Sequence, residues 1–232
     1  MAAHNVVLHV IYGIPCVGKS TTAVALAYHR DIRTVIHTDY VREVQRGFVS
    51  AEQAPALARV THDAWKLYGP PTTANIVAGF VDHVEQVAVG IDIVVKKLVR
   101  DGLDAVIEGA HFHGRIIDNL RATNPHADIE ATLLIVRTID ELRQRIDDKQ
   151  RRRAPTADDK QWRDNSQVML ILQDHLMSDA HAHGIPIEAI GGWRNSWNPA
   201  KSSSSTWTMS WRRAAGSRVS SDTSCPRTCR AC

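Results

Sequence analysis

The chain has 232 residues, which at roughly 100–200 residues per domain predicts one large domain, or one domain with an appendage. Hydrophobic residues make up 44% and charged residues 23% of it, proportions that exclude a wholly disordered or fibrous chain. The net charge of +3 combines +5 over residues 201–232 with −2 over the remainder. The basic character therefore belongs to the end of the chain and is weak support for a nucleic-acid partner.

Hydropathy and cysteine usage narrow the class of protein further. The uninterrupted apolar runs fall well short of the roughly 18 residues that span a bilayer, and the N-terminus lacks a basic region, so neither a membrane helix nor a secretory signal is expected. Only Cys16 lies outside the last eight residues, where Cys225, Cys229 and Cys232 offer three ligands and no fourth for a closed zinc site. A reducing, cytoplasmic location is the expectation.

Taken in chain order, the hydrophobic pattern alternates between strands and helices. Short apolar runs predict five strands, at 6–12, 33–38, 103–107, 129–136 and 185–190. Apolar residues at a spacing of three or four, or good helix formers, predict helices after residue 20 and at 40–46, 52–68, 75–100, 115–123, 139–152 and 159–182. This alternation indicates βαβ units. It predicts an α/β fold: a P-loop NTPase three-layer sandwich, with a mostly parallel five-stranded sheet, flanking helices and a helical lid.

The pattern stops after about residue 195. Nine of the last 32 residues are serine, and no apolar periodicity remains. Such a composition buries too little surface to offset the entropy lost on ordering. The sequence therefore predicts a domain over 1–195 and a disordered Ser/Arg/Cys-rich tail over 196–232.

A complete Walker A motif follows the first strand. Its residues, with the one after it, are Gly13, Ile14, Pro15, Cys16, Val17, Gly18, Lys19, Ser20 and Thr21. Backbone N–H groups of such a loop surround a polyphosphate, so glycines are needed where the backbone turns sharply. Lys19 is expected to reach the β- and γ-phosphates and Ser20 to ligate Mg²⁺. The positive end of the following helix favours the phosphates, so ATP and Mg²⁺ are the expected cofactors.

A carboxylate and a guanidinium follow the second strand. Asp39 and Arg42 are one helical turn apart, at the sheet edge where open α/β sheets bind ligands. The carboxylate is suited to accepting the proton of an alcohol during phosphoryl transfer, and the guanidinium to binding an anionic acceptor. The alternative is that Asp39 caps the helix at 40–46.

A second carboxylate ends the third strand. Glu108 occupies the position of a Walker B residue, where it would orient Mg²⁺ or position the acceptor. His111 follows at the same edge and is a candidate for substrate contact, with His113 a weaker one. The alternatives are a solvated strand-end glutamate and surface histidines.

Arginines gather around Pro155, between the last two predicted helices. They are Arg143, Arg145, Arg151, Arg152 and Arg153. P-loop kinases commonly close an arginine-bearing lid over the transferred phosphoryl group, which makes Arg145 and Arg152 candidate substrate-binding residues. The alternative is a solvated helix face.

Five segments together resemble the 2-phosphoglycerate kinase family from about residue 8 to 192. They are Thr38-Asp-Tyr-Val-Arg-Glu-Val, Arg46-Gly-Phe-Val-Ser, Ala64-Trp-Lys, Val81-Asp-His-Val-Glu-Gln-Val-Ala-Val-Gly-Ile and Val106-Ile-Glu-Gly-Ala-His. The resemblance implies ATP- and Mg²⁺-dependent phosphorylation of the 3-hydroxyl of 2-phosphoglycerate, giving 2,3-bisphosphoglycerate. It assigns Lys19 and Ser20 to the nucleotide and metal, and Asp39 and Arg42 to the acceptor. Glu108 and His111 would form a second functional element, a carboxylate with a histidine. The chain departs from the family at Phe112-His113-Gly114, where an apolar pair and Pro-Gly are usual.

Other functions remain open at this level. The same motifs suit a zeta-toxin-like sugar-nucleotide kinase or a polynucleotide 5′-kinase, although the acidic body disfavours a phosphate-backbone ligand. An ATP-binding regulatory protein without turnover, and a nucleic-acid binder acting through the tail, are the non-enzyme alternatives. The sequence leaves the oligomeric state open and does not decide whether Asp39 or Glu108 is the base.

Overall fold

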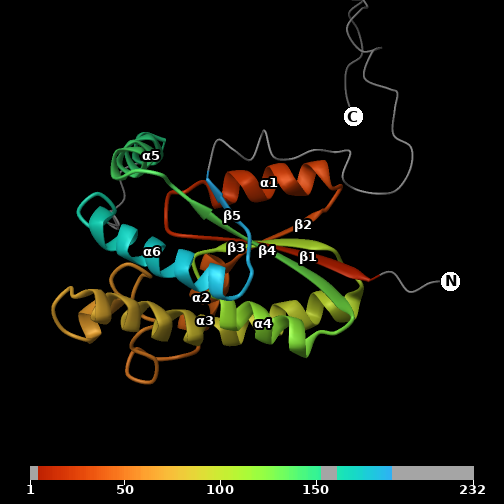
Figure 1. The fold of residues 1–232 in the computed structure, drawn as a ribbon. Helices are drawn as coiled ribbons and strands as arrows, with labels where there is room; N and C mark the ends of the chain where they lie inside the picture. The colour runs from red at the N-terminus through yellow and green to blue at the C-terminus, as the bar shows by residue number, and fades with distance from the viewer. Residues whose placement is uncertain (1–4, 153–160, 190–232) are drawn as a thin grey trace, which may run out of the picture. The chain divides into compact units, whose positions relative to one another are not determined.

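The computed structural model describes residues 5–152 and 161–189 of the chain (Figure 1). Five parallel strands form one sheet in the order β2-β3-β1-β4-β5. The strands are β1 (Val6–Tyr12), β2 (Thr34–His37), β3 (Ala105–Gly109), β4 (Ala127–Ile135) and β5 (Ile187–Ala189). The α-helices are α1 (Lys19–His29), α2 (Thr38–Arg46), α3 (Thr73–Asp101), α4 (Gly114–Thr123), α5 (Ile139–Arg151) and α6 (Ser166–Ala182). The predicted α/β class is confirmed.

Helices cover both faces of the sheet, as its nearly continuous apolar strands require. In Figure 1, α1 lies on one face and α3, α4 and α6 lie on the other. The two central strands, β1 and β3, are almost entirely buried. Tyr12 and Phe112 meet edge-to-face in this core, with ring centroids 6.2 Å apart.

The register of the sheet brings three chain segments to one edge. Glu108 of β3 pairs with Ile11 of β1 on one side and with His37 of β2 on the other. The loops that leave these strands therefore start side by side at the carboxyl edge, where parallel α/β sheets bind ligands.

The longest helix, α3, has clear sequence signals at both ends. Thr72 precedes it, and its side chain accepts a hydrogen bond from the Asn75 N–H. Gly102 follows it in the left-handed conformation, with φ +69°, a common helix stop. The observed bounds extend the predicted 75–100 by one or two residues at each end.

One predicted helix is wrong. Residues 52–68 form turns and a short 3₁₀ helix, η1 (Ala64–Leu67), rather than an α-helix. Side chains of α2 and α3 form hydrogen bonds with backbone N–H and C=O groups of this segment, which in an α-helix would bond to one another. Gln86 accepts from the Leu57 N–H, His83 donates to the Ala56 carbonyl and Arg42 donates to the Arg59 carbonyl.

The last predicted helix also differs at its start. It was expected from residue 159, but α6 begins at Ser166 after a turn over 162–165, and Gln161 has a φ of +38°. Residues 159 and 160 lie outside the described residues, as do Arg153, Pro155 and the tail over 196–232. The described residues all fall within one compact unit, Met1–Ser196.

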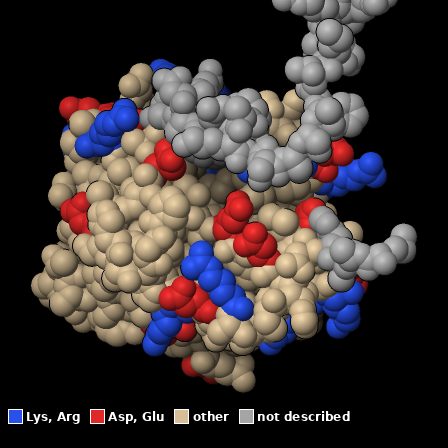
Figure 2. All heavy atoms as spheres, turned by 45° about the vertical axis from the view of Figure 1, so that its right-hand side comes forward, with Lys and Arg blue, Asp and Glu red and all other residues tan. Residues whose placement is uncertain are grey.

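The described surface carries mixed charge. Figure 2 shows Lys and Arg side chains interspersed with Asp and Glu on the face in view. Several are paired along a helix, as Lys96 is with Asp92 at 2.6 Å. Within residues 5–152 and 161–189, each helix is too short or too polar to cross a lipid bilayer.

Candidate active site

The Walker A segment links β1 to α1 as a tight loop. Gly13 has a φ of +146°, and a Cβ there would lie 2.3 Å from the carbonyl oxygen of Leu134. Gly18 also has a positive φ, +94°, and directly precedes the helix. Both positions therefore require glycine. Cys16 adopts a left-handed φ of +67° without being glycine, so this loop holds local backbone strain.

The nine predicted nucleotide-binding residues divide into anchors and lining. Ile14 and Val17 are buried in the core and fix the loop to the sheet. Six further residues, Pro15, Cys16, Gly18, Lys19, Ser20 and Thr21, line one or both of two cavities. Gly13 lines neither cavity and packs against Leu134.

Lys19 is held across the loop. Its Nζ donates a 2.8 Å hydrogen bond to the carbonyl oxygen of Ile14, and only 9% of the residue is exposed. Burial lowers the pKa of the Lys19 ammonium, against the raising effects of Glu108 and Asp39. A buried ammonium beside such a loop is suited to bind an anion.

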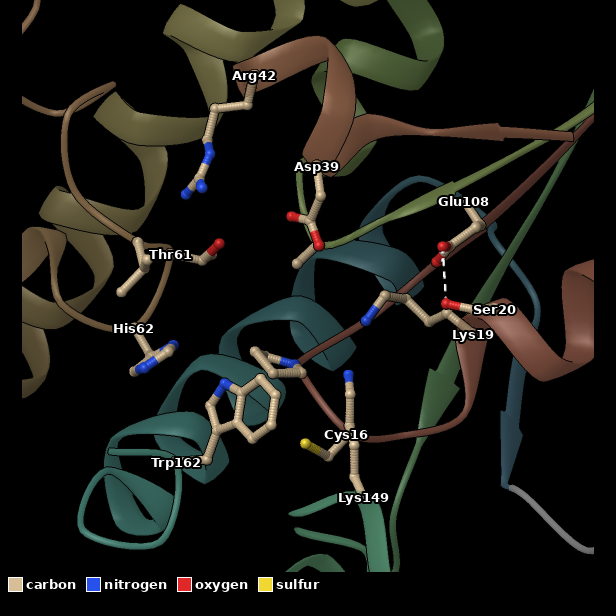
Figure 3. Close-up of a pocket in the computed structure, with 13 residues that line it drawn as sticks. Cys16, Lys19, Ser20, Asp39, Arg42, Thr61, His62, Glu108, Lys149 and Trp162 are labelled. Carbon is tan, nitrogen blue, oxygen red and sulfur yellow. Dashed lines mark hydrogen bonds between the residues drawn. The ribbon is translucent and has the colours of Figure 1, made fainter. Parts of the chain in front are cut away.

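Glu108 connects the loop to the neighbouring strand. Its Oε1 accepts a 2.8 Å hydrogen bond from the Ser20 hydroxyl and lies 2.5 Å from His37 Nδ1. The Glu108 side chain is 7% exposed. Its carboxylate is thus fixed by two partners and directed at the first turn of α1 (Figure 3).

Asp39 and Arg42 lie in the first turns of α2, on the opposite side of the same cavity. His37, not Asp39, precedes α2 as its N-cap. The Asp39 side chain is 66% exposed. Arg42 is buried, donates to the Arg59 carbonyl at 3.1 Å, and has an Nε without a hydrogen-bond partner among the described residues. Both residues of the predicted pair therefore line this cavity.

His111 lies behind this wall and lines neither cavity. It is fully buried, with Nδ1 2.6 Å from Thr38 Oγ1 and Nε2 3.8 Å from Asp39 Oδ1. Its ring lies 5.2 Å from that of His83. Burial, and then the nearby His83, lowers the pKa of His111 well below its ordinary value, so the ring is neutral.

Two of the predicted arginines, one in α5 and one directly after it, lie beside the loop. Arg145 and Arg152 line the second cavity with Gly18, Thr21 and Asp148. Arg145 is bound by Glu141 at 2.7 Å, and Arg151 by Asp148. Arg143 lies 4.0 Å from Asp140 on an exposed part of the helix. Of the arginines in this group that the structure describes, Arg145 and Arg152 line the cavity beside the loop.

His113 lies elsewhere. It precedes α4, is bound by Glu85 at 2.9 Å and does not line either cavity.

Several cavity residues were not predicted from the sequence. Thr61 and His62 come from the irregular segment that was expected to be helical, and Lys149 and Trp162 come from α5 and the turn before α6. Lys149 Nζ lies 4.6 Å from the centroid of the Trp162 ring. His37 was missed as well. A weak signal was available for Lys149, which stands among the arginines of its segment.

The donor set fits a nucleotide and a hard cation. The oxygens of Ser20 and Glu108 lie 2.8 Å apart beside the loop, and oxygen ligands of this kind suit Mg²⁺ that also binds phosphate. No cluster of three His, Cys, Asp or Glu side chains that would hold a metal by itself occurs within the described part of the chain.

Comparison with curated proteins finds kinases that are similar to this chain in sequence. No family model matches the chain. A 2-phosphoglycerate kinase of Pyrococcus horikoshii is 35% identical over 188 residues, which are 79% of this chain and 59% of that protein. A mevalonate-3-phosphate 5-kinase of Thermoplasma acidophilum is 34% identical over 114 residues, 49% of this chain and 55% of that protein. A gluconokinase structure from Sinorhizobium meliloti aligns with a TM-score of 0.43 at 13% identity, covering 80% of this chain and 82% of that one.

The chain spans little more than half the length of the curated relatives it matches. The aligned share of this chain is nonetheless large. The predicted resemblance is therefore confirmed: over 79% of its length, the chain is a relative of the 2-phosphoglycerate kinase family.

Proposed function

We propose that the chain is an ATP-dependent kinase that phosphorylates a hydroxyl group of a small phosphorylated acid, with 2-phosphoglycerate as the first candidate acceptor. The observation that carries the proposal is the cavity in Figure 3, where the Walker A loop faces a carboxylate and a buried arginine. A site that only binds a nucleotide would not need the carboxylate and the arginine opposite the loop.

The loop provides the nucleotide side. Backbone N–H groups at the start of α1, together with Lys19, would surround the phosphates of ATP. Ser20 and Glu108 would hold Mg²⁺, which when bound neutralises charge on the phosphate oxygens. Arg145 and Arg152 line the cavity beside Gly18 and Thr21, a position suited to the polyphosphate.

Asp39 is the better candidate for the base. Both side-chain contacts of Glu108, to the Ser20 hydroxyl and to His37 Nδ1, engage the same oxygen of a buried carboxylate, which suits a fixed metal ligand. Asp39 instead projects into the cavity and is largely exposed. In the transfer, the acceptor oxygen forms a bond to the γ-phosphorus as the bond to the β,γ-bridging oxygen breaks. The electron pair leaves with ADP, and the hydroxyl proton passes to Asp39.

Arg42 supports an anionic acceptor. A buried guanidinium is costly unless it is paired. Among the described residues, its one carboxylate contact is Glu43 at 3.4 Å, which is itself exposed. Thr61 and His62 line the cavity beside it (Figure 3). A phosphate or carboxylate of the acceptor would complete the pairing of Arg42. The two relatives are named for acceptors that share this chemistry, an acid bearing one phosphate and a free hydroxyl.

The alternative acceptors fit less well. A polynucleotide needs a basic groove, whereas residues 1–200 carry a net charge of −2. A sugar nucleotide would use the same Asp39 and Arg42, so it belongs in the test. An ATP-binding protein without turnover would not require a carboxylate in the cavity. A cytoplasmic location stays a prediction, as does Mg²⁺ as the specific metal.

The test is ADP release from the purified chain with ATP and Mg²⁺. The acceptors are 2-phosphoglycerate, 3-phosphoglycerate, glycerate, mevalonate 3-phosphate, a UDP-sugar, a 5′-hydroxyl oligonucleotide and buffer alone. We expect stimulation by a phosphorylated acid and none in Lys19→Ala. Stimulation only by the oligonucleotide or UDP-sugar would contradict the acceptor class. Tight ATP binding without stimulation by any acceptor would favour the regulatory alternative.

A further inference from the structure

Two cavities meet above the Walker A loop. One is lined by Asp39, Arg42 and Glu108. The other is lined by Gly18, Thr21, Arg145 and Arg152. Four residues line both cavities: Cys16, Lys19, Ser20 and Lys149. Three of them belong to the loop. Among the described residues, Lys149 is thus the one residue from another element that borders both spaces.

The position of Lys149 is set by an aromatic ring. Its Nζ lies 4.6 Å from the centroid of Trp162, which is 5% exposed and packs into the core. A cation over a desolvated indole face is stabilised by the ring, yet its charge is not neutralised. Arg145, one turn earlier, is instead ion-paired with Glu141. Within the described part of the chain, no carboxylate lies within ion-pair distance of Lys149.

Lys149 and Lys19 approach the same space. Figure 3 shows their side chains extending toward each other from α5 and from the loop. Burial is the main cause that lowers the pKa of Lys19, and the charge of Lys149 lowers it further. Two ammonium groups that converge in this way repel each other unless an anion lies between them.

We propose that Lys149 is a catalytic residue that contacts the phosphoryl group while it passes from ATP to the acceptor, and that Trp162 is its positioning residue. The proposal rests on the kinase function proposed above. During transfer, negative charge spreads over the three equatorial oxygens of the phosphoryl group, between the leaving oxygen of ADP and the attacking oxygen of the acceptor. Lys149 stands where these two sites join, and it supplies charge there without donating or accepting a proton.

The central variant is Lys149→Met, which keeps the side-chain stem and removes the charge. A matched control is Lys96→Met, an exposed lysine of α3 paired with Asp92. The readouts are kcat, the Kd of ADP alone, and the Kd of ADP with aluminium fluoride, a mimic of the phosphoryl group in transit. The last readout does not depend on knowing the acceptor.

We expect Lys149→Met to lower kcat by about 10²-fold, as loss of one donor to a transition state does. Affinity for ADP with aluminium fluoride should fall by a similar factor, while affinity for ADP alone changes less than about threefold. Lys96→Met should match the wild type. Trp162→Phe, which keeps a weaker cation–π partner, should lose less activity than Trp162→Leu.

Two results would overturn the proposal. One is a Lys149→Met variant with kcat and analogue affinity within about threefold of the wild type. The other is an equal loss for ADP alone and for ADP with aluminium fluoride, which would make Lys149 a general nucleotide-binding residue. Wild-type protein that binds ADP and the analogue but phosphorylates none of the acceptors would contradict the proposed function, while the analogue would still decide the role of Lys149.

Discussion

At the scale of single residues, the polar groups of the site differ in their burial and in their neighbours. Glu108 and Asp39 are both carboxylates at the same sheet edge. Glu108 is held between Ser20 and His37, whereas Asp39 extends into the cavity. The surroundings of the two carboxylates favour Glu108 as metal ligand and Asp39 as base. The sequence alone does not distinguish these roles, because the residues that contact Glu108 are 71 and 88 positions away along the chain.

Asn in place of Asp39 tests the role of the base. The amide has nearly the same shape but does not accept the hydroxyl proton, so Asp39→Asn should lower kcat by roughly 10²–10⁴-fold. ATP affinity should stay close to that of the wild type. Steady-state kinetics and equilibrium nucleotide binding measure the two effects, with Asp92→Asn on the surface of α3 as control. Turnover near the wild-type rate in Asp39→Asn would exclude this role.

The buried histidines predict a pH dependence of stability. Burial is the main cause that lowers the pKa of His83 from 6.5 to about 4, and it also lowers the pKa of His111. Below pH 6.5 these two histidines bind protons in the unfolded chain but stay neutral in the folded chain. Stability is therefore complete above that pH and is lost as the pH falls toward 4, by up to about 1.4 kcal/mol per pH unit for each such histidine.

Urea unfolding at pH 7.5 and pH 5.0 measures this effect. The free energy of unfolding should be lower at pH 5.0, and the difference should shrink in His83→Gln, which does not titrate. Equal stability of the wild type at the two pH values would show that His83 and His111 keep their ordinary pKa when folded.

At the scale of elements, the strands and most helices follow from local pattern. The apolar run of β1, the Walker A spacing and the apolar face of α3 are all local signals, and each element was predicted within a few residues. The segment 52–68 was not, because its backbone is bound by side chains of α2 and α3 rather than by itself. Thr61 and His62 reach the cavity through this non-local arrangement, so no local pattern predicted them.

Gly79 fixes that segment against α3. A Cβ at this position would lie 2.4 Å from the Trp65 nitrogen and 2.5 Å from the Ala64 carbonyl carbon, so Gly79→Ala must push η1 away. We expect a loss of about 1–3 kcal/mol in unfolding free energy. We also expect a raised KM for the acceptor, because Thr61 and His62 are carried by the adjoining turn, with little change in ATP affinity.

The matched control is Gly102→Ala, at the end of α3. It has a φ of +69° and open space around it, so it should cost about 1–2 kcal/mol without affecting the cavity. A parallel rise in acceptor KM in both variants would mean that general destabilisation, not the position of η1, is the cause.

At the scale of the whole molecule, one sheet edge collects residues from along the chain. The loop after β1, the start of α2 after β2 and the end of β3 could be placed there from the sequence, because parallel strands share one carboxyl edge. Lys149 and Trp162 could not, because their approach depends on how α5 and α6 pack over the sheet. The residues at the carboxyl edge of the sheet could thus be predicted from the sequence, whereas Lys149 and Trp162, which come from α5 and the turn before α6, could not.

The predicted boundary near residue 195 also belongs to this scale. The composition change there leads us to expect that a chain ending at Ser196 keeps the catalytic properties. Its kcat and its thermal midpoint should match those of the full chain within about twofold and about 2 °C, because few apolar residues with regular spacing lie beyond that point. A large loss of either quantity on truncation would assign the tail a part in the domain.

The central claim is that a phosphoryl group moves from ATP to the hydroxyl of a phosphorylated acid in the cavity between the Walker A loop and α2. The most direct measurement follows ³³P from [γ-³³P]ATP into 2-phosphoglycerate, with product separation, for the wild type, Lys19→Ala and Asp39→Asn. Labelled bisphosphoglycerate from the wild type, and loss of nearly all of it in both variants, is the predicted result. Label that appears only as inorganic phosphate, or transfer that Asp39→Asn leaves unchanged, would contradict the account.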